Sequence, residues 1–154
     1  MFSESVIKEL EEVRVKYPDS RSALLPALYI AQSEYGWLSP EAMQAVSSAL
    51  NIPPAIVKGV STFYAMFKHK PMGRHLIQLC TNISCMILGA ETLLDLLKKR
   101  YGIEEGGTTS DERFSLIIME CIGGCDVAPV MLVDNDYYGN LNEEIILEVL
   151  EKYK

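Results

Sequence analysis

The sequence has few histidines, no long hydrophobic run and little basic surface. Its two uncharged stretches, residues 42–57 and 76–90, contain polar side chains and are too short to cross a membrane. The net charge of −7, with Lys98–Arg100 as the single basic cluster, excludes a nucleic acid-binding surface. Residues 1–5 lack the basic region of a secretory signal. We therefore expect a cytoplasmic protein without direct membrane insertion.

Several cofactor motifs are also missing. The sequence has no Gly-x-Gly-x-x-Gly, and the run Glu104–Gly107 lacks the spacing and the lysine of a phosphate-binding loop. A Rieske centre needs two histidine ligands, but His69 and His75 are the only histidines and both precede the first cysteine. We expect structural or surface roles for both histidines, and no catalytic acid or base.

The chain has four cysteines, and they form two pairs. Cys80 and Cys85 enclose four residues, Cys121 and Cys125 enclose three, and 35 residues separate the pairs. Four thiolates complete the coordination of a 2Fe-2S cluster or of a structural zinc ion. In a reducing compartment, paired cysteines more often bind metal or do redox chemistry than form structural disulfides.

Three interpretations of the cysteines remain open on spacing alone: a 2Fe-2S cluster, a zinc site, and dithiol or inert cysteines. The cluster is favoured because the spacers are loose and unequal, and because Gly123 and Gly124 let backbone N–H groups approach sulfur. A thioredoxin-type dithiol would have two intervening residues. Nearby apolar residues are expected to limit water around the site: Ile83, Met86, Ile122, Val127 and Pro129.

Residues 1–70 predict four short amphipathic helices in a small bundle. Apolar residues recur at helical spacing in the segments that begin at Val6 and Leu24. Ser39-Pro40-Glu41 predicts the start of a third helix, with a cap, a proline in the first turn and an acid near the helix N-terminus. Residues 51–54 end that helix and open a fourth, and residues 69–73 predict a linker.

The aromatic residues near this linker allow two interpretations. They are expected to pack the helical region onto the following sheet, or to form part of a subunit interface. They are Phe63, Tyr64 and Phe67.

Residues 71–154 predict the order β-α-β-β-β-α. The expected elements are strands at 75–80 and 114–120, a helix at 88–101 ending at Gly102, a hairpin at 130–138 and a last helix capped by Asn142. A right-handed crossover makes the first two strands parallel. Cys80 and Cys121 then emerge at the same edge of the sheet, where two loops can bring four sulfurs together.

Several motifs carry a resemblance to a known family. They are Cys80-Thr-Asn-Ile-Ser-Cys85, Leu88-Gly89-Ala90, Thr108-Thr109-Ser110-Asp111, Glu120-Cys121-Ile122-Gly123-Gly124-Cys125 and Ala128-Pro129, with Leu24–Leu28, Gly36–Ser39 and Thr62–Tyr64 in the helical half. Together they resemble the thioredoxin-like 2Fe-2S subunit of NADH-quinone oxidoreductase (respiratory complex I) over nearly the whole chain. One departure is Glu112, where that family often has glycine.

The resemblance implies an α+β chain with a helical bundle (1–70) and a thioredoxin-like 2Fe-2S domain (71–154), a mixed sheet with flanking helices. It implies a 2Fe-2S cluster held by Cys80, Cys85, Cys121 and Cys125, each pair on one iron by our hypothesis. It also implies electron transfer beside a flavoprotein subunit that holds FMN and binds NADH, within a larger respiratory complex peripheral to the cytoplasmic side of the inner membrane.

Two other functions are compatible with the same sequence features. One is the equivalent subunit of an NAD-linked hydrogenase or formate dehydrogenase. The other is a structural zinc-binding interaction module.

Overall fold

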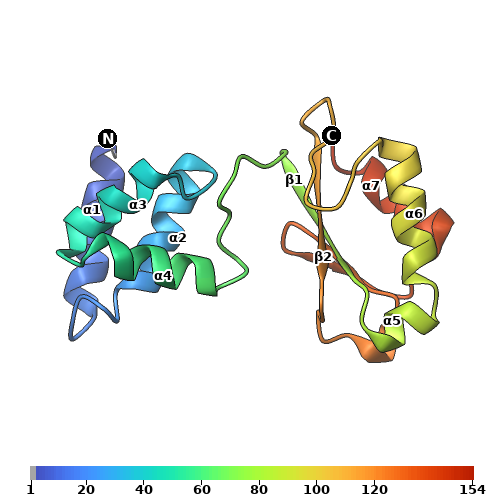
Figure 1. Ribbon diagram of the computed structural model, residues 1–154, viewed down its shortest axis with the longest axis horizontal. Helices are drawn as coiled ribbons and strands as arrows, with labels where there is room; N and C mark the ends of the chain where they lie inside the picture. Colours follow the sequence, from blue (N-terminus) through green and yellow to red (C-terminus); the bar gives the residue numbers. More distant parts are fainter. Residues whose placement is uncertain (1–2) are drawn as a thin grey trace. The chain divides into compact units, whose positions relative to one another are not determined.

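The computed structural model describes residues 3–154. The chain forms two compact units, Met1–Pro71 and Met72–Lys154, which are described separately (Figure 1). Residues 1 and 2 belong to the expected bundle and to the N-terminal segment 1–5, and they lie outside the described residues. Within residues 3–154, every helix is too short or too polar to span a membrane.

The first unit is helical, as predicted. Its helices are α1 (Glu4–Lys16), α2 (Leu24–Tyr35), α3 (Pro40–Leu50) and α4 (Pro54–Phe63). The Ala42 N–H donates to the Ser39 hydroxyl at 3.1 Å, so the predicted cap at the start of α3 is confirmed. Asn51 ends α3 with a φ of 52°, a left-handed conformation that asparagine tolerates better than most residues.

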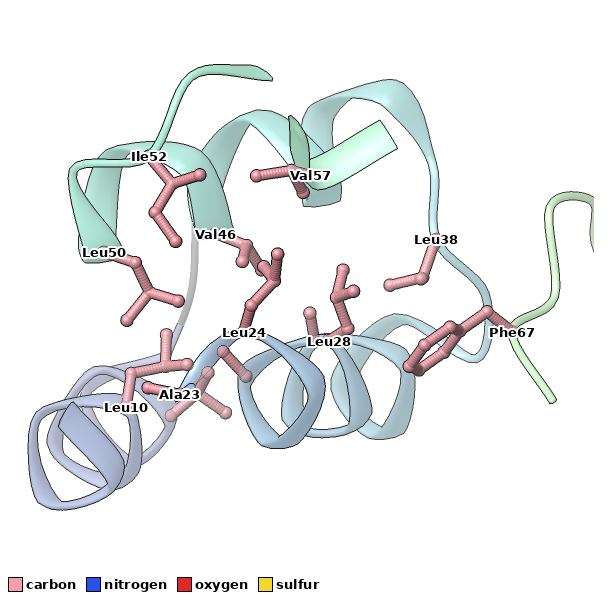
Figure 2. Close-up of a cluster of buried hydrophobic side chains, with 13 residues drawn as sticks. Leu10, Ala23, Leu24, Leu28, Leu38, Val46, Leu50, Ile52, Val57 and Phe67 are labelled. Atoms are coloured by element: carbon pink, nitrogen blue, oxygen red, sulfur yellow. The ribbon is translucent and has the colours of Figure 1, made fainter. Parts of the chain in front are cut away.

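The apolar stripes of these helices meet in one core (Figure 2). Leu28 of α2 and Val46 of α3 are completely buried there, and Phe67 joins the same core after α4. The Phe67 ring lies 5.2 Å from that of Tyr29. Phe67 therefore packs within the helical unit, whereas Phe63 is 80% exposed.

The second unit is a four-stranded mixed sheet with helices. Its elements are β1 (His75–Cys80), α5 (Ile83–Ile87), α6 (Ala90–Tyr101), β2 (Phe114–Met119), the 3₁₀ turn η1 (Cys125–Val127), β3 (Met131–Val133), β4 (Asp136–Tyr138) and α7 (Glu143–Glu151). The strand order is β2-β1-β3-β4. β1 and β2 are parallel, and the other neighbours are antiparallel. The predicted α+β fold is confirmed.

One face of the sheet packs against α6 and α7. Ile77 of β1 lies opposite Leu116 of β2 and Val133 of β3, and all three are completely buried. Apolar residues of both helices complete the same core: Leu93, Leu97, Ile146, Val149 and Leu150. Because side chains alternate along a strand, the residues next to Ile77, Leu116 and Val133 in their strands belong to the opposite face of the sheet.

Two local features differ from the sequence-based prediction. Residues 83–87 form a separate short helix, and the helix expected from residue 88 begins at Ala90. Gly89 separates the two with a φ of 97°, which only glycine adopts readily. The departure at Glu112 also has a structural counterpart, because its φ of 55° lies in the left-handed region that favours glycine.

Candidate metal centre

The parallel pairing of β1 and β2 brings the two cysteine motifs to one edge of the sheet. Cys80 is the last residue of β1 and lies opposite Met119, the last residue of β2. The Thr81 N–H donates to the Met119 carbonyl at 3.2 Å, so the chains leave the sheet side by side. Cys121 follows two residues later, and Figure 1 shows α5 and the segment after β2 at this same end.

Cys85 lies in the middle of α5, close to the end of β1. The Asn82 side chain accepts a hydrogen bond from the Ile83 N–H at 2.7 Å and starts this helix. The Asn82 carbonyl accepts from the Met86 N–H at 2.8 Å and completes its first turn. Cys80 and Cys85 are each only 2% exposed, so this half of the site belongs to the interior of the unit.

Cys121 and Cys125 form the exposed half of the site. Gly123 lies between them with a φ of 84°, and a Cβ there would meet open space, so the backbone conformation alone favours glycine. Cys125 opens η1, whose turn closes when the Val127 N–H donates to the Gly124 carbonyl at 3.2 Å. The loop therefore leaves both of its cysteines accessible to solvent.

The Cys80 sulfur is the centre of a hydrogen-bond network. Burial alone would raise the pKa of its thiol, but backbone N–H groups of Asn82 and Ile122 donate to the sulfur, and the thiols of Cys85 and Cys121 donate as well. Together these bonds hold the pKa of Cys80 below its usual value. Three of the four sulfurs are thus directly linked.

Cys85 has the opposite shift. Burial raises the pKa of its thiol, and the nearby Cys80 and Cys125 add to this effect, although the Val130 N–H donates to the sulfur. Because Cys125 acts electrostatically on Cys85, the fourth sulfur also lies near the group. All four cysteines are free thiols rather than disulfides.

The apolar surroundings match the prediction only in part. The two buried cysteines pack with Ala90, Ala128 and Val130, and Ile122 and Val127 lie partly buried against them. Pro129 is buried as well. In contrast, Ile83 and Met86 are 66% and 45% exposed and do not belong to this buried cluster.

Tyr137 is a neighbour of the site that the sequence did not indicate. Negative charge at Cys85, Cys80 and Cys125 is among the causes that raise the pKa of its phenol, after burial and the carboxylate of Asp126. The sequence placed this residue only in a hairpin. Its proximity follows from the pairing of β4 with β3, which no local motif encodes.

The donor set fits a 2Fe-2S cluster. Within residues 3–154, no three histidine, cysteine or acidic side chains surround a position for one metal ion. A 2Fe-2S cluster does not need such a group, because each iron takes two protein sulfurs. Backbone N–H groups donate hydrogen bonds to the sulfurs of Cys80 and Cys85. The ligand sulfurs of a 2Fe-2S cluster accept hydrogen bonds of this kind.

Two curated relatives of this chain are both subunits of NADH-quinone oxidoreductases. An NADH-quinone oxidoreductase subunit of Rhizobium meliloti is 43% identical over 147 residues, covering 96% of this chain and 88% of that protein. Its counterpart in the Escherichia coli K12 enzyme is 41% identical over 138 residues, with 90% and 83% covered. An NAD⁺-reducing [NiFe]-hydrogenase structure matches with a TM-score of 0.74 and 28% identity over 84% of this chain, but this chain spans only 22% of that one.

The family model for thioredoxin-like [2Fe-2S] ferredoxins matches residues 10–154, nearly the whole chain. This match confirms the resemblance predicted from the cysteine motifs and the predicted class of cofactor, a 2Fe-2S cluster. The chain therefore belongs to the thioredoxin-like [2Fe-2S] ferredoxin family.

Proposed function

We propose that this chain is the 2Fe-2S electron-transfer subunit of an NADH-quinone oxidoreductase. The observation that carries the proposal is the arrangement of four free thiols at one edge of the sheet, with backbone N–H groups directed at two of them. The relatives named above supply the enzyme class. The chain is an electron carrier within an enzyme and has no substrate site of its own.

The ligands in this proposal are the four cysteines, with Cys80 and Cys85 on one iron and Cys121 and Cys125 on the other. A bound 2Fe-2S cluster supplies reversible one-electron transfer. The chain's own residues hold it, exclude water from its buried half, and set its potential through N–H groups of Asn82, Ile122 and Val130.

The proposed partner is a flavoprotein subunit that holds FMN and binds NADH. A cluster bound by this chain would exchange single electrons with that flavin. A run of exposed apolar side chains beside Cys85 supports a docking surface next to the cysteines: Ile83, Met86, Ile87 and Leu88. We define these four residues as the α5 patch. It flanks Cys85 along the chain, so a partner seated there would lie close to the site.

Within this proposal the whole assembly is a respiratory complex on the cytoplasmic side of the inner membrane, with this chain in its peripheral part. The similarity to the hydrogenase structure supports a second candidate function, the equivalent subunit of an NAD-linked hydrogenase. The proteins that co-purify with the chain distinguish the two: quinone reductase subunits support the first, and a nickel-containing subunit supports the second.

The ligand set is tested with Cys125→Ala in the purified chain. We expect loss of the visible absorbance and of the EPR signal after dithionite reduction, and iron and acid-labile sulfide below the wild-type amount of about two each per chain. The control is Asp126→Asn, a neighbouring change on the same exposed turn, which should keep both signals. An unchanged EPR signal in the Cys125→Ala variant would exclude Cys125 as a ligand. A wild-type chain that is colourless and contains zinc would refute the 2Fe-2S cluster.

The docking surface is tested with Ile87→Glu. Ile87 is 73% exposed, so a charge should not disturb folding, but it should greatly reduce co-purification of the flavoprotein. Val15→Glu is the control, because Val15 is another exposed aliphatic residue, on α1. Equal recovery of the partner with both variants would show that the α5 patch is not the interface.

A further inference from the structure

Strand pairing places Tyr137 on the same face of the sheet as Cys80. Tyr137 lies opposite Leu132, and Leu132 lies opposite Gln78 in β1. Cys80 is two residues beyond Gln78, so alternation puts its side chain on that face as well. The next residue, Tyr138, lies opposite the buried Met131 and belongs to the face covered by helices.

The hydroxyl end of Tyr137 also occupies the space beside the Gly124 backbone. A Cβ built on Gly124 would overlap the Tyr137 hydroxyl and lie 2.7 Å from Cζ of the ring. Gly124 has a φ of −112°, which other residues adopt, so conformation does not demand glycine there. A side chain at 124 would instead have to push the hydroxyl end of Tyr137 aside, and its Cβ would lie 3.1 Å from Cγ1 of Val130. Tyr137 therefore rests directly on the backbone of the loop that carries Cys121 and Cys125.

Tyr137 presents its hydroxyl to this loop. A phenol keeps its proton at neutral pH, so the group is an O–H dipole against the backbone of Gly124, one residue before Cys125. A donor dipole stabilises negative charge, and one-electron reduction adds negative charge at this site.

We propose that Tyr137 is a positioning residue of the metal centre, which holds the Cys121–Cys125 loop through Gly124 and raises the reduction potential through its hydroxyl. This inference rests on the proposed function, because it requires a cluster bound by the four cysteines. It adds one aromatic residue from β4 to the cysteine ligands and backbone donors.

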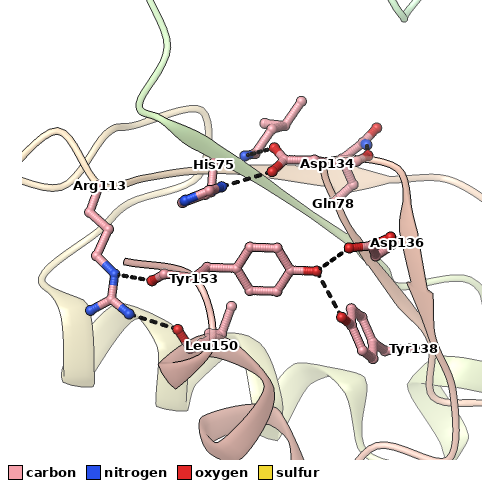
Figure 3. A network of polar contacts seen from close by, with 9 residues as sticks. His75, Gln78, Arg113, Asp134, Asp136, Tyr138, Leu150 and Tyr153 are labelled. Atoms are coloured by element: carbon pink, nitrogen blue, oxygen red, sulfur yellow. Dashed lines mark hydrogen bonds and ion pairs between the residues drawn. The ribbon is translucent and has the colours of Figure 1, made fainter.

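The potential is tested with Tyr137→Phe, which removes only the hydroxyl. We expect a lower midpoint potential in an EPR-monitored redox titration, with the iron content unchanged. Tyr138→Phe is a matched control, because it loses the same group one residue further along β4, where the hydroxyl contacts Tyr153 at 2.7 Å (Figure 3). Its potential should equal that of the wild type.

Three other results of this titration would contradict the proposal or the function on which it rests. If Tyr137→Phe binds iron normally and keeps the wild-type potential, or shifts it no more than Tyr138→Phe does, the proposed role of the hydroxyl is overturned. Loss of iron in Tyr137→Phe would also overturn it, because the hydroxyl would then be needed for assembly. If the wild-type chain itself binds no 2Fe-2S cluster, the proposed function fails instead.

The steric part is tested by a double-mutant cycle on cluster retention in EDTA. Gly124→Ala should speed cluster loss in the presence of Tyr137, and should have little further effect when Tyr137→Ala has opened the space. Gly123→Ala is the control, because its strain comes from the positive φ and should persist in both backgrounds. Equal effects of Gly124→Ala in the two backgrounds would contradict the contact.

Discussion

Arg113 is predicted to stabilise the sheet unit by holding the C-terminal end of α7. Its Nε donates to the Tyr153 carbonyl at 2.6 Å and its Nη2 donates to the Leu150 carbonyl at 2.7 Å (Figure 3). The guanidinium carbon also lies 4.5 Å from the centre of the Phe114 ring. Each hydrogen bond contributes about 1 kcal/mol net, and the cation–ring contact about 0.5–1 kcal/mol. Arg113→Met should therefore lower the free energy of unfolding by about 2–3 kcal/mol.

Urea unfolding of the cluster-loaded chain measures this loss. Visible circular dichroism of the cluster reports on the sheet unit, which avoids treating a two-unit chain as one transition. The control is Lys98→Met, which removes an exposed ion pair with Glu104 (Nζ–Oε2 3.5 Å) and should change stability by about 0–1 kcal/mol. Hydrogen exchange of the Tyr153 amide should accelerate only in Arg113→Met. Equal losses in the two variants, or unchanged exchange at Tyr153, would refute the reasoning.

Three further predictions concern other parts of the fold. Leu28→Ala, at a completely buried position, should destabilise the helical unit by about 3–5 kcal/mol in far-UV unfolding, and a loss below about 1 kcal/mol would contradict its role in the core. Glu112→Gly should stabilise the chain by about 0.5–1 kcal/mol in urea, because it relieves a left-handed backbone. Hydrogen bonds from the Thr109 hydroxyl and then the Arg113 N–H hold the pKa of Asp111 below its usual value. The stability that this carboxylate contributes is present above its unfolded pKa and is lost as the pH falls through the lower folded value. Thr109→Val should raise that pKa in an NMR titration, and an unmoved titration would exclude the hydroxyl as its main cause.

The features best predicted from sequence were those encoded by neighbouring residues. Ser39 caps α3 and Asn142 caps α7, where its side chain accepts from the Ile145 N–H at 2.8 Å. The parallel strands were also predicted, since one crossover rule fixes their direction. That rule was enough to bring Cys80 and Cys121 to the same edge.

The features that the sequence does not reveal depend on contacts between distant residues or on an element too short to show a pattern. Asn82 caps α5 by accepting from the next N–H, that of Ile83, whereas Asn142 accepts from an N–H three residues further on. A five-residue helix also shows too little periodicity to be recognised. The exposure of Ile83 could not be derived, because apolar composition does not say which side of a short helix is covered. Tyr137 reaches the cysteines only through the order of the strands.

The fit between Gly124 and Tyr137 couples substitutions at two positions that lie in different elements. A side chain at position 124 would meet the Tyr137 hydroxyl, so an alanine there would displace the ring from its place against the loop. Across relatives, the two positions should therefore covary, with a bulkier residue at 124 accompanied by a smaller one at 137.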